Sequence, residues 1–168
     1  MAKLFEITKF KWIAMMLIAA AGAGGASARA DSAAVQQQLS DALARGDVPA
    51  AVALFTDDAV IDTESGLCAS VPCVGRAAIQ KDLERYVADK SRHVTSLGTY
   101  ISGNVVVMHF EARSAQIEKA GVHRIILWGI REMKGDKIAS SRCCLPDRTD
   151  SQTARFIEWD YAHPSSSK

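Results

Sequence analysis

Apolar residues in the first half of the chain recur at the spacing of an α-helix. The first stripe follows the capping residue Ser32 and ends before Gly46; it consists of Val35, Leu39, Ala42 and Leu43. Asp47 and Pro49 predict the start of a second, short helix, with Val52 and Phe55 facing inward. A third helix is predicted over residues 76–89 by a stripe made of Ala78, Ile79, Leu83 and Tyr86. Three helices are therefore expected before residue 90.

Beyond residue 90 the apolar pattern repeats every second residue, which is typical of β-strands. Turn residues separate four predicted strands, over residues 94–101, 105–113, 122–133 and 137–145, and a loop over 114–121 joins the second to the third. A shorter strand, 59–61, is predicted after the polar break at Thr56, Asp57 and Asp58. The apolar residues Phe156, Ile157 and Trp159 predict a docked C-terminal segment. Helices followed by antiparallel hairpins indicate an α+β fold in one domain, residues 31–168.

The first thirty residues have the organisation of a secretory signal peptide. A basic segment precedes the apolar run 12–21, and small residues end in an Ala-x-Ala site at residues 28–30. We therefore predict cleavage before Asp31 and a periplasmic or secreted protein. The alternative is a membrane anchor, but its uncharged stretch, residues 12–28, is at the short limit for spanning a bilayer. No membrane contact is expected once the leader is removed.

Charge and motifs exclude several classes of partner. The chain has 20 basic and 19 acidic residues; residues 1–30 contain four of the basic and one of the acidic residues, so the mature chain has a net charge of −2. No basic run remains that could follow a phosphate backbone, so nucleic acid is not an expected partner. Glycine-rich nucleotide loops, a G-x-S-x-G elbow and an H-E-x-x-H pair are absent from the sequence, and the histidines are scattered. We therefore predict no cofactor and no metal.

All four cysteines lie beyond the leader, and in an oxidising compartment an even number suggests disulfides. Cys68 and Cys73 flank a short loop, so we expect a bond between them because closing that loop costs little entropy. Cys143 and Cys144 are adjacent in a predicted strand, where neighbouring side chains point to opposite faces, so a bond between them would need a distorted backbone. The alternative is two long-range bridges from the 68–73 loop to residues 143 and 144. The spacing does not match a structural zinc site, and the cysteines are interpreted as structural.

Two short segments resemble a known superfamily. They are Ala42-Leu43-Ala44-Arg45-Gly46-Asp47 and Ala53-Leu54-Phe55-Thr56-Asp57-Asp58-Ala59. Together with Gly75 and Ala78-Ile79 at the third helix and the long terminal hairpins, they are similar to the nuclear transport factor 2-like (NTF2-like) superfamily, which includes the SnoaL-like polyketide cyclases and the ketosteroid isomerases. The resemblance covers most of residues 33–145. It implies a cone-shaped domain in which three N-terminal helices pack in a strongly curved antiparallel β-sheet, with a pocket for a hydrophobic small molecule at the open end and a homodimer as the assembly.

The catalytic site of the isomerases does not carry over to this sequence. The position of the general-base aspartate falls on Thr63, one residue after Asp62, and a one-residue slip in a strand turns a side chain to the other face. The helix-1 tyrosine falls on Leu39, and the second oxyanion donor falls near Trp128. Steroid isomerisation by that route is therefore not expected.

Six residues remain as candidates for chemistry at the mouth of the cone. Asp62 and His109 are the candidate catalytic acid–base pair. The candidate ligand-binding residues are Thr63, Tyr100, Trp128 and Arg142. The resemblance would turn the face that carries Trp128 toward the cavity, whereas the sequence alone leaves open which face is concave.

Several candidates also have a purely structural interpretation. Asp62 can close the turn into the following loop, His109 can be held in place by hydrogen bonds, and Arg142 can pair with Glu111 across strands. Two functional hypotheses therefore stand. One is an exported small-molecule enzyme that uses acid–base catalysis without a cofactor, of the isomerase, cyclase, dehydratase or hydrolase type. The other is a non-catalytic module that binds a hydrophobic small molecule or a partner protein.

Overall fold

The computed structural model describes residues 31–63 and 67–163. The predicted signal peptide lies outside this range. None of the helices within the range is both long and apolar enough to cross a membrane.

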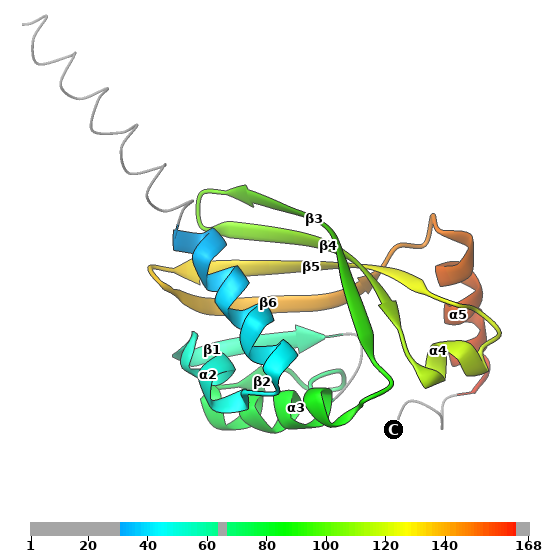
Figure 1. The fold of residues 1–168 in the computed structure, drawn as a ribbon, viewed down its shortest axis with the longest axis horizontal. Helices are drawn as coiled ribbons and strands as arrows, with labels where there is room; N and C mark the ends of the chain where they lie inside the picture. The colour runs from blue at the N-terminus through cyan, green and yellow to red at the C-terminus, as the bar shows by residue number, and fades with distance from the viewer. Residues whose placement is uncertain (1–30, 64–66, 164–168) are drawn as a thin grey trace, which may run out of the picture.

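One six-stranded, strongly curved sheet forms the body of the domain (Figure 1). The strands lie in the order β2-β1-β6-β5-β4-β3, with these bounds: β1 Phe55–Thr63, β2 Cys73–Val74, β3 His93–Ser102, β4 Val105–Arg113, β5 Ile125–Lys134 and β6 Lys137–Pro146. The neighbours are antiparallel except for β1 and β6, which are parallel. The last strand in sequence thus lies inside the sheet, between the first strand and the β3–β5 meander.

Helices cover the concave face of this sheet and one end of it (Figure 1). A helix over residues 31–45, called the N-terminal helix below, crosses the sheet; α2 Val48–Ala53 and α3 Arg76–Ala88 lie beside β1 and β2. Two further helices, α4 Ala115–Lys119 and α5 Ser151–Ala162, lie beyond the far ends of β4 and β5. As the sequence predicts, Asp47 caps α2, and its Oδ1 accepts a hydrogen bond from the Ala50 amide at 3.1 Å.

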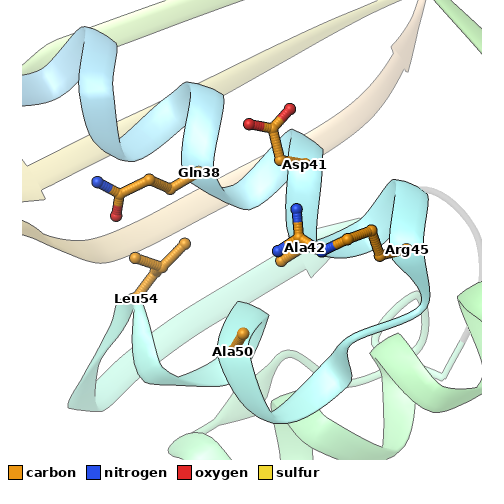
Figure 2. Close-up of a pocket in the computed structure, with 6 residues that line it drawn as sticks. All are labelled: Gln38, Asp41, Ala42, Arg45, Ala50 and Leu54. Atoms are coloured by element: carbon orange, nitrogen blue, oxygen red, sulfur yellow. The ribbon is translucent and has the colours of Figure 1, made fainter.

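The core lies between the concave face and the helices. Its fully buried side chains include Leu39 of the N-terminal helix, Phe55 of β1, Ile79 of α3 and Val106 of β4. On β4 and β5 the inward row is the more apolar one, as burial of one sheet face requires. On the other side of the helix layer, a surface groove of about 260 Å³ lies between the N-terminal helix and the end of α2 (Figure 2). Its lining residues are Gln38, Asp41, Ala42, Arg45, Ala50 and Leu54.

The structure differs from the predicted elements at several places, among them Phe55, which lies in β1 rather than in the second helix, and the unpredicted short strand β2. β1 begins at Phe55, so Asp57 and Asp58 belong to the strand; an irregular register between Phe55 and Val60 accommodates this polar stretch. The expected loop 114–121 contains the one-turn helix α4, capped by Ser114. The third long strand begins at Ile125 rather than at residue 122.

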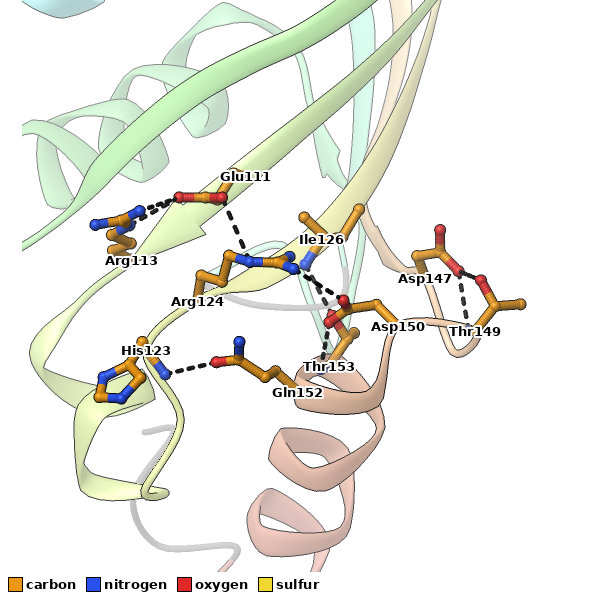
Figure 3. Close-up of polar contacts among 10 residues, drawn as sticks. All are labelled: Glu111, Arg113, His123, Arg124, Ile126, Asp147, Thr149, Asp150, Gln152 and Thr153. Atoms are coloured by element: carbon orange, nitrogen blue, oxygen red, sulfur yellow. Dashed lines mark hydrogen bonds and ion pairs between the residues drawn. The ribbon is translucent and has the colours of Figure 1, made fainter.

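The docked C-terminal segment is a capped helix. Asp150 caps α5 by accepting the Thr153 amide at 2.9 Å, and Thr153 in turn accepts the Ile126 amide of β5 at 2.8 Å (Figure 3). Arg124 bridges this cap to the sheet, 3.2 Å from Asp150 and 3.6 Å from Glu111. These bonds fix the start of α5 to β4 and β5.

The disulfide prediction is confirmed: Cys68 and Cys73 are bonded, with their sulfur atoms 2.05 Å apart. The alternative with two long-range bridges is wrong, because Cys143 and Cys144 are both free.

Candidate functional site

Five of the six predicted site residues share one face of the sheet. Pairing register aligns Tyr100, Val107, Ile130, Arg142 and Asp62 in one row across five strands. His109 and Trp128 are paired in the neighbouring row, with their rings stacked at a centroid distance of 4.0 Å. This is the outer, convex face, because the alternate residues of the same strands contact the N-terminal helix. The expectation that the Trp128 face lines the cavity is therefore wrong.

The contacts of these residues on the outer face match their structural interpretation only in part, because His109 Nε2 is buried and has no hydrogen-bond partner. Arg142 Nε lies 3.5 Å from Asp62 Oδ2, and both side chains are about half exposed. The partner of Arg142 is thus Asp62 rather than Glu111. The Trp128 indole donates to Asp147, whose pKa is held below its usual value mainly by the Thr149 hydroxyl and only in smaller part by Trp128.

Asp62 and His109 are not close enough to act as a pair. Three strand spacings separate β1 from β4, which is roughly 14 Å at about 4.8 Å per spacing. A catalytic acid and base must lie within hydrogen-bond reach of one reacting group or of each other. The catalytic role of these two residues stays a prediction that this geometry does not support.

Thr63, the sixth predicted residue, faces the interior. It belongs to a cluster of polar side chains that was not predicted from the sequence. Thr63 is buried next to Cys143, its register partner on β6. Tyr86 of α3, Arg131 of β5 and Cys144 complete the cluster, since each of these groups acts electrostatically on the others. We call Thr63, Tyr86, Arg131, Cys143 and Cys144 the interior cluster.

Arg131 supplies the positive charge of the interior cluster. Its Nη1 donates to Gln36 of the N-terminal helix and to the Met108 sulfur at 3.0 Å, while its Nε is enclosed and has no hydrogen-bond partner. Burial lowers the pKa of this guanidinium, and the neighbouring thiols and Tyr86 oppose that effect. Arginine remains charged in proteins, so an incompletely paired cation lies inside the cone.

Tyr86 is the second polar group of the cluster that could contact a ligand. Burial raises the pKa of its phenol, the nearby thiols contribute to the rise, and Arg92, whose guanidinium lies 4.8 Å from the ring centroid, opposes it. Tyr86 is therefore a neutral hydrogen-bond donor at physiological pH.

A β-bulge brings the two free cysteines to the same face. Trp128 pairs with Leu145 and Ile130 with Arg142, so Gly129 alone faces both Cys143 and Cys144. Cys144 adopts a left-handed backbone conformation, with φ of 69°. The expected alternation of these side chains is wrong for this physical reason. Their thiols are close enough to hydrogen-bond, which lowers the pKa of Cys144 and raises that of Cys143.

The chemistry available in the interior cluster is anion binding, hydrogen-bond donation and thiol chemistry. Among the described residues, no carboxylate is one of the charged groups that act on Arg131. Within the same part of the chain, no three His, Cys, Asp or Glu side chains are grouped as metal ligands. One signal in the sequence pointed to this place: Arg131 interrupts an otherwise apolar row of β5 that includes Ile125, Leu127 and Met133.

Comparison with known proteins identifies the fold. Residues 35–140 match the SnoaL-like domain family. No curated protein matches the chain in sequence.

Solved structures resemble the chain in shape at low sequence identity. An LEH-like epoxide hydrolase from M. tuberculosis has 15% identity and a TM-score of 0.57, over 82% of this chain and 98% of that one. An NTF2-like protein of unknown function from Mesorhizobium loti has 12% identity and a TM-score of 0.60, over 71% and 93%. A de novo designed protein with a curved β-sheet has 12% identity and a TM-score of 0.56, over 78% and 98%. At these identities the likeness shows the cone-shaped α+β fold alone.

Proposed function

This chain belongs to the SnoaL-like domain family, within the NTF2-like superfamily, and on that premise we propose that it is an exported protein that binds a small, largely apolar molecule inside its cone. The ligand carries a carboxylate or another anionic oxygen group, which Arg131 binds. Tyr86 donates a second hydrogen bond to the same end of the ligand.

The enclosed Nε of Arg131 is the observation that carries this proposal. A buried cationic donor without an acceptor is costly, and a ligand oxygen would satisfy it. Apolar side chains surround the guanidinium: Met108 contacts it directly, and Phe110 packs against the core cluster one position further along the inward row of β4. An apolar surface with one fixed charge is the usual composition of a site for an amphipathic small molecule.

The geometry favours binding over acid–base catalysis. The candidate acid and base, Asp62 and His109, lie on the outer face, and no carboxylate of the described chain is among the groups that act on Arg131. Within the described residues no carboxylate acts on Arg131, and the one candidate base of the interior cluster is the Cys144 thiol, so the cluster is better suited to hold and orient a molecule than to abstract a carbon-bound proton.

We further propose that the outer face forms a homodimer. Tyr100 and Ile130 are exposed large side chains on this face, and Val107 lies between them in the same row. An apolar row across the middle of a sheet is typical of a surface that a second copy covers.

Ligand binding is tested by measuring affinities for amphipathic carboxylates and for the matching alcohols of the same chain length. The wild-type protein should bind the carboxylates more tightly, and Arg131→Met should remove that preference. A hydrogen bond to a charged group contributes about 1.5–3 kcal/mol, so the expected loss is roughly 10- to 100-fold in affinity.

Arg142→Met is the matched control, because it removes an arginine from the outer face of the neighbouring strand. This control should bind like the wild type. Equal carboxylate affinity in wild type and Arg131→Met, with both proteins folded by circular dichroism, contradicts the proposal.

A further inference from the structure

We propose that Cys143 and Cys144 are a redox-active dithiol that exchanges with small disulfide molecules and closes to a disulfide between adjacent residues. The inference concerns thiol chemistry and does not depend on the proposed ligand.

The backbone at this site places the two thiols together before any reaction. In a regular strand adjacent side chains diverge, but the bulge opposite Gly129 turns both sulfur atoms toward the interior cluster. The left-handed conformation of Cys144, which is uncommon for a residue with a Cβ, accompanies this arrangement. The thiols are within hydrogen-bond distance of each other.

Gly129 lies opposite the bulge on the neighbouring strand. A Cβ at this position would lie 2.7 Å from Cε of Met108 on β4, so that methionine side chain would have to shift, and 3.7 Å from the Arg142 carbonyl oxygen, which is an ordinary contact distance.

The surroundings distinguish the roles of the two thiols. Cys144 receives hydrogen bonds from Cys143 and from Thr63, and the guanidinium groups of Arg92 and Arg131 also favour its thiolate, so its pKa is lowered. The pKa of Cys143 is raised well above its usual value, first because it donates to Cys144 and then because it is desolvated. Cys144 is thus the attacking thiolate and Cys143 the resolving thiol.

The reaction is an exchange in two steps. The Cys144 thiolate attacks one sulfur of a small disulfide R–S–S–R, which forms a mixed disulfide and releases one thiolate RS⁻. Cys143 then loses its proton to solvent or to the released thiolate, and its sulfur attacks Sγ of Cys144. The Cys143–Cys144 bond forms and the second RS⁻ leaves. The protein gives up two electrons and two protons in total, and the disulfide is reduced to two RSH molecules.

The site has the wrong ligand number for a structural metal. Both cysteines are half-buried residues. In the described part of the chain no third metal-ligating residue joins them, whereas structural zinc uses four ligands.

The test equilibrates the mature protein with graded mixtures of reduced and oxidised glutathione and then alkylates the remaining thiols. Trypsin places Cys143 and Cys144 in the peptide 143–148 and the Cys68–Cys73 bridge in the peptide 46–76, so mass spectrometry reads the two pairs separately. We expect peptide 143–148 to change from two alkylated thiols to an internal disulfide as the mixture becomes more oxidising. Peptide 46–76 should stay bridged and serves as the internal control.

Two variants identify the attacking thiol. Cys143→Ser should accumulate a glutathione adduct on Cys144, because no resolving thiol remains. Cys144→Ser should form its adduct more slowly, because Cys143 stays desolvated and lacks the hydrogen bond from Thr63 that favours the Cys144 thiolate. If wild-type peptide 143–148 stays fully alkylated in the most oxidising mixture, or carries only glutathione adducts, the proposal is overturned. Equal rates in the two variants overturn the assignment of Cys144.

Discussion

Thr153 connects the C-terminal helix to the sheet, and its replacement by valine measures that connection. Its side chain is fully buried, and its Oγ1 accepts the Ile126 amide at 2.8 Å while donating to Asp150 Oδ1 at 2.9 Å (Figure 3). Valine preserves the branched shape and nearly the same volume, so Thr153→Val removes the hydroxyl without creating a large cavity.

The expected loss follows from the two hydrogen bonds. The buried Ile126 N–H is left without its acceptor, which costs about 1–3 kcal/mol, and the bond to the Asp150 carboxylate contributes about 1 kcal/mol more. We therefore expect the free energy of unfolding to fall by about 2–4 kcal/mol, a large part of the roughly 5–15 kcal/mol typical of a domain.

Urea unfolding followed by circular dichroism and by tryptophan fluorescence measures this loss. Thr149→Val is the matched control: Thr149 also bonds an aspartate, Asp147 at 2.6 Å, but it is exposed and bonds no strand amide. The control should change stability by less than about 0.5 kcal/mol. If Thr153→Val is no more destabilised than Thr149→Val, the reasoning from the buried amide is refuted.

Three further predictions concern acid stability, assembly and the disulfide. The hydrogen bond from the Thr153 amide is the main cause that lowers the pKa of Asp150 in the folded state. The ionised Asp150 carboxylate therefore stabilises the fold fully above its unfolded pKa of about 3.9, and this stabilisation is lost as pH falls through the folded pKa. Urea titrations should therefore show Asp150→Asn less stable than the wild type at pH 7, with the difference shrinking as the pH falls below about 3.9, and parallel curves would contradict this. Ile130→Glu should convert the proposed homodimer to a monomer in sedimentation velocity, whereas Val71→Glu in the exposed disulfide loop should not; a monomeric wild type would refute the proposed dimer. Replacing Cys68 and Cys73 together by serine should lower unfolding stability by about 2 kcal/mol, from the entropy of a loop with sequence separation 5, and a loss below about 0.5 kcal/mol would contradict the loop-entropy argument.

Hydrophobic periodicity predicted most helices and strands well, because burying one face of a helix or strand requires apolar residues at a regular spacing. The strand predicted over 105–113 coincides with β4, and the helix predicted over 76–89 differs from α3 by one residue at its end. The start of β1 could not be predicted in this way, since Asp57 and Asp58 are exposed polar residues at an irregularity of register between Phe55 and Val60, where the alternation of buried and exposed residues is interrupted.

Five of the six candidate site residues share one face of the sheet, but it is the outer face, and Thr63 lies on the inner one. Alternation places Tyr100, His109 and Trp128 on one side, and it also shows that Met108 and Phe110 lie on the more apolar side, which the core requires. That signal, rather than the family resemblance, identifies the concave face. The dithiol could not be foreseen, because the bulge at Cys144 breaks the period of two on which face assignments depend.

The parallel pairing of β1 with β6 affects how the chain can fold. Asp62 is aligned with Arg142, 80 positions later, and β6 separates β1 from the rest of the sheet. Contacts between such distant segments form slowly, because a long loop must close before they can stabilise anything. The N-terminal helices therefore have no complete sheet to pack on until synthesis has passed residue 146. A polypeptide with this topology lacks its complete sheet until late in synthesis, and a chain that has not yet folded can be threaded through a narrow translocation channel.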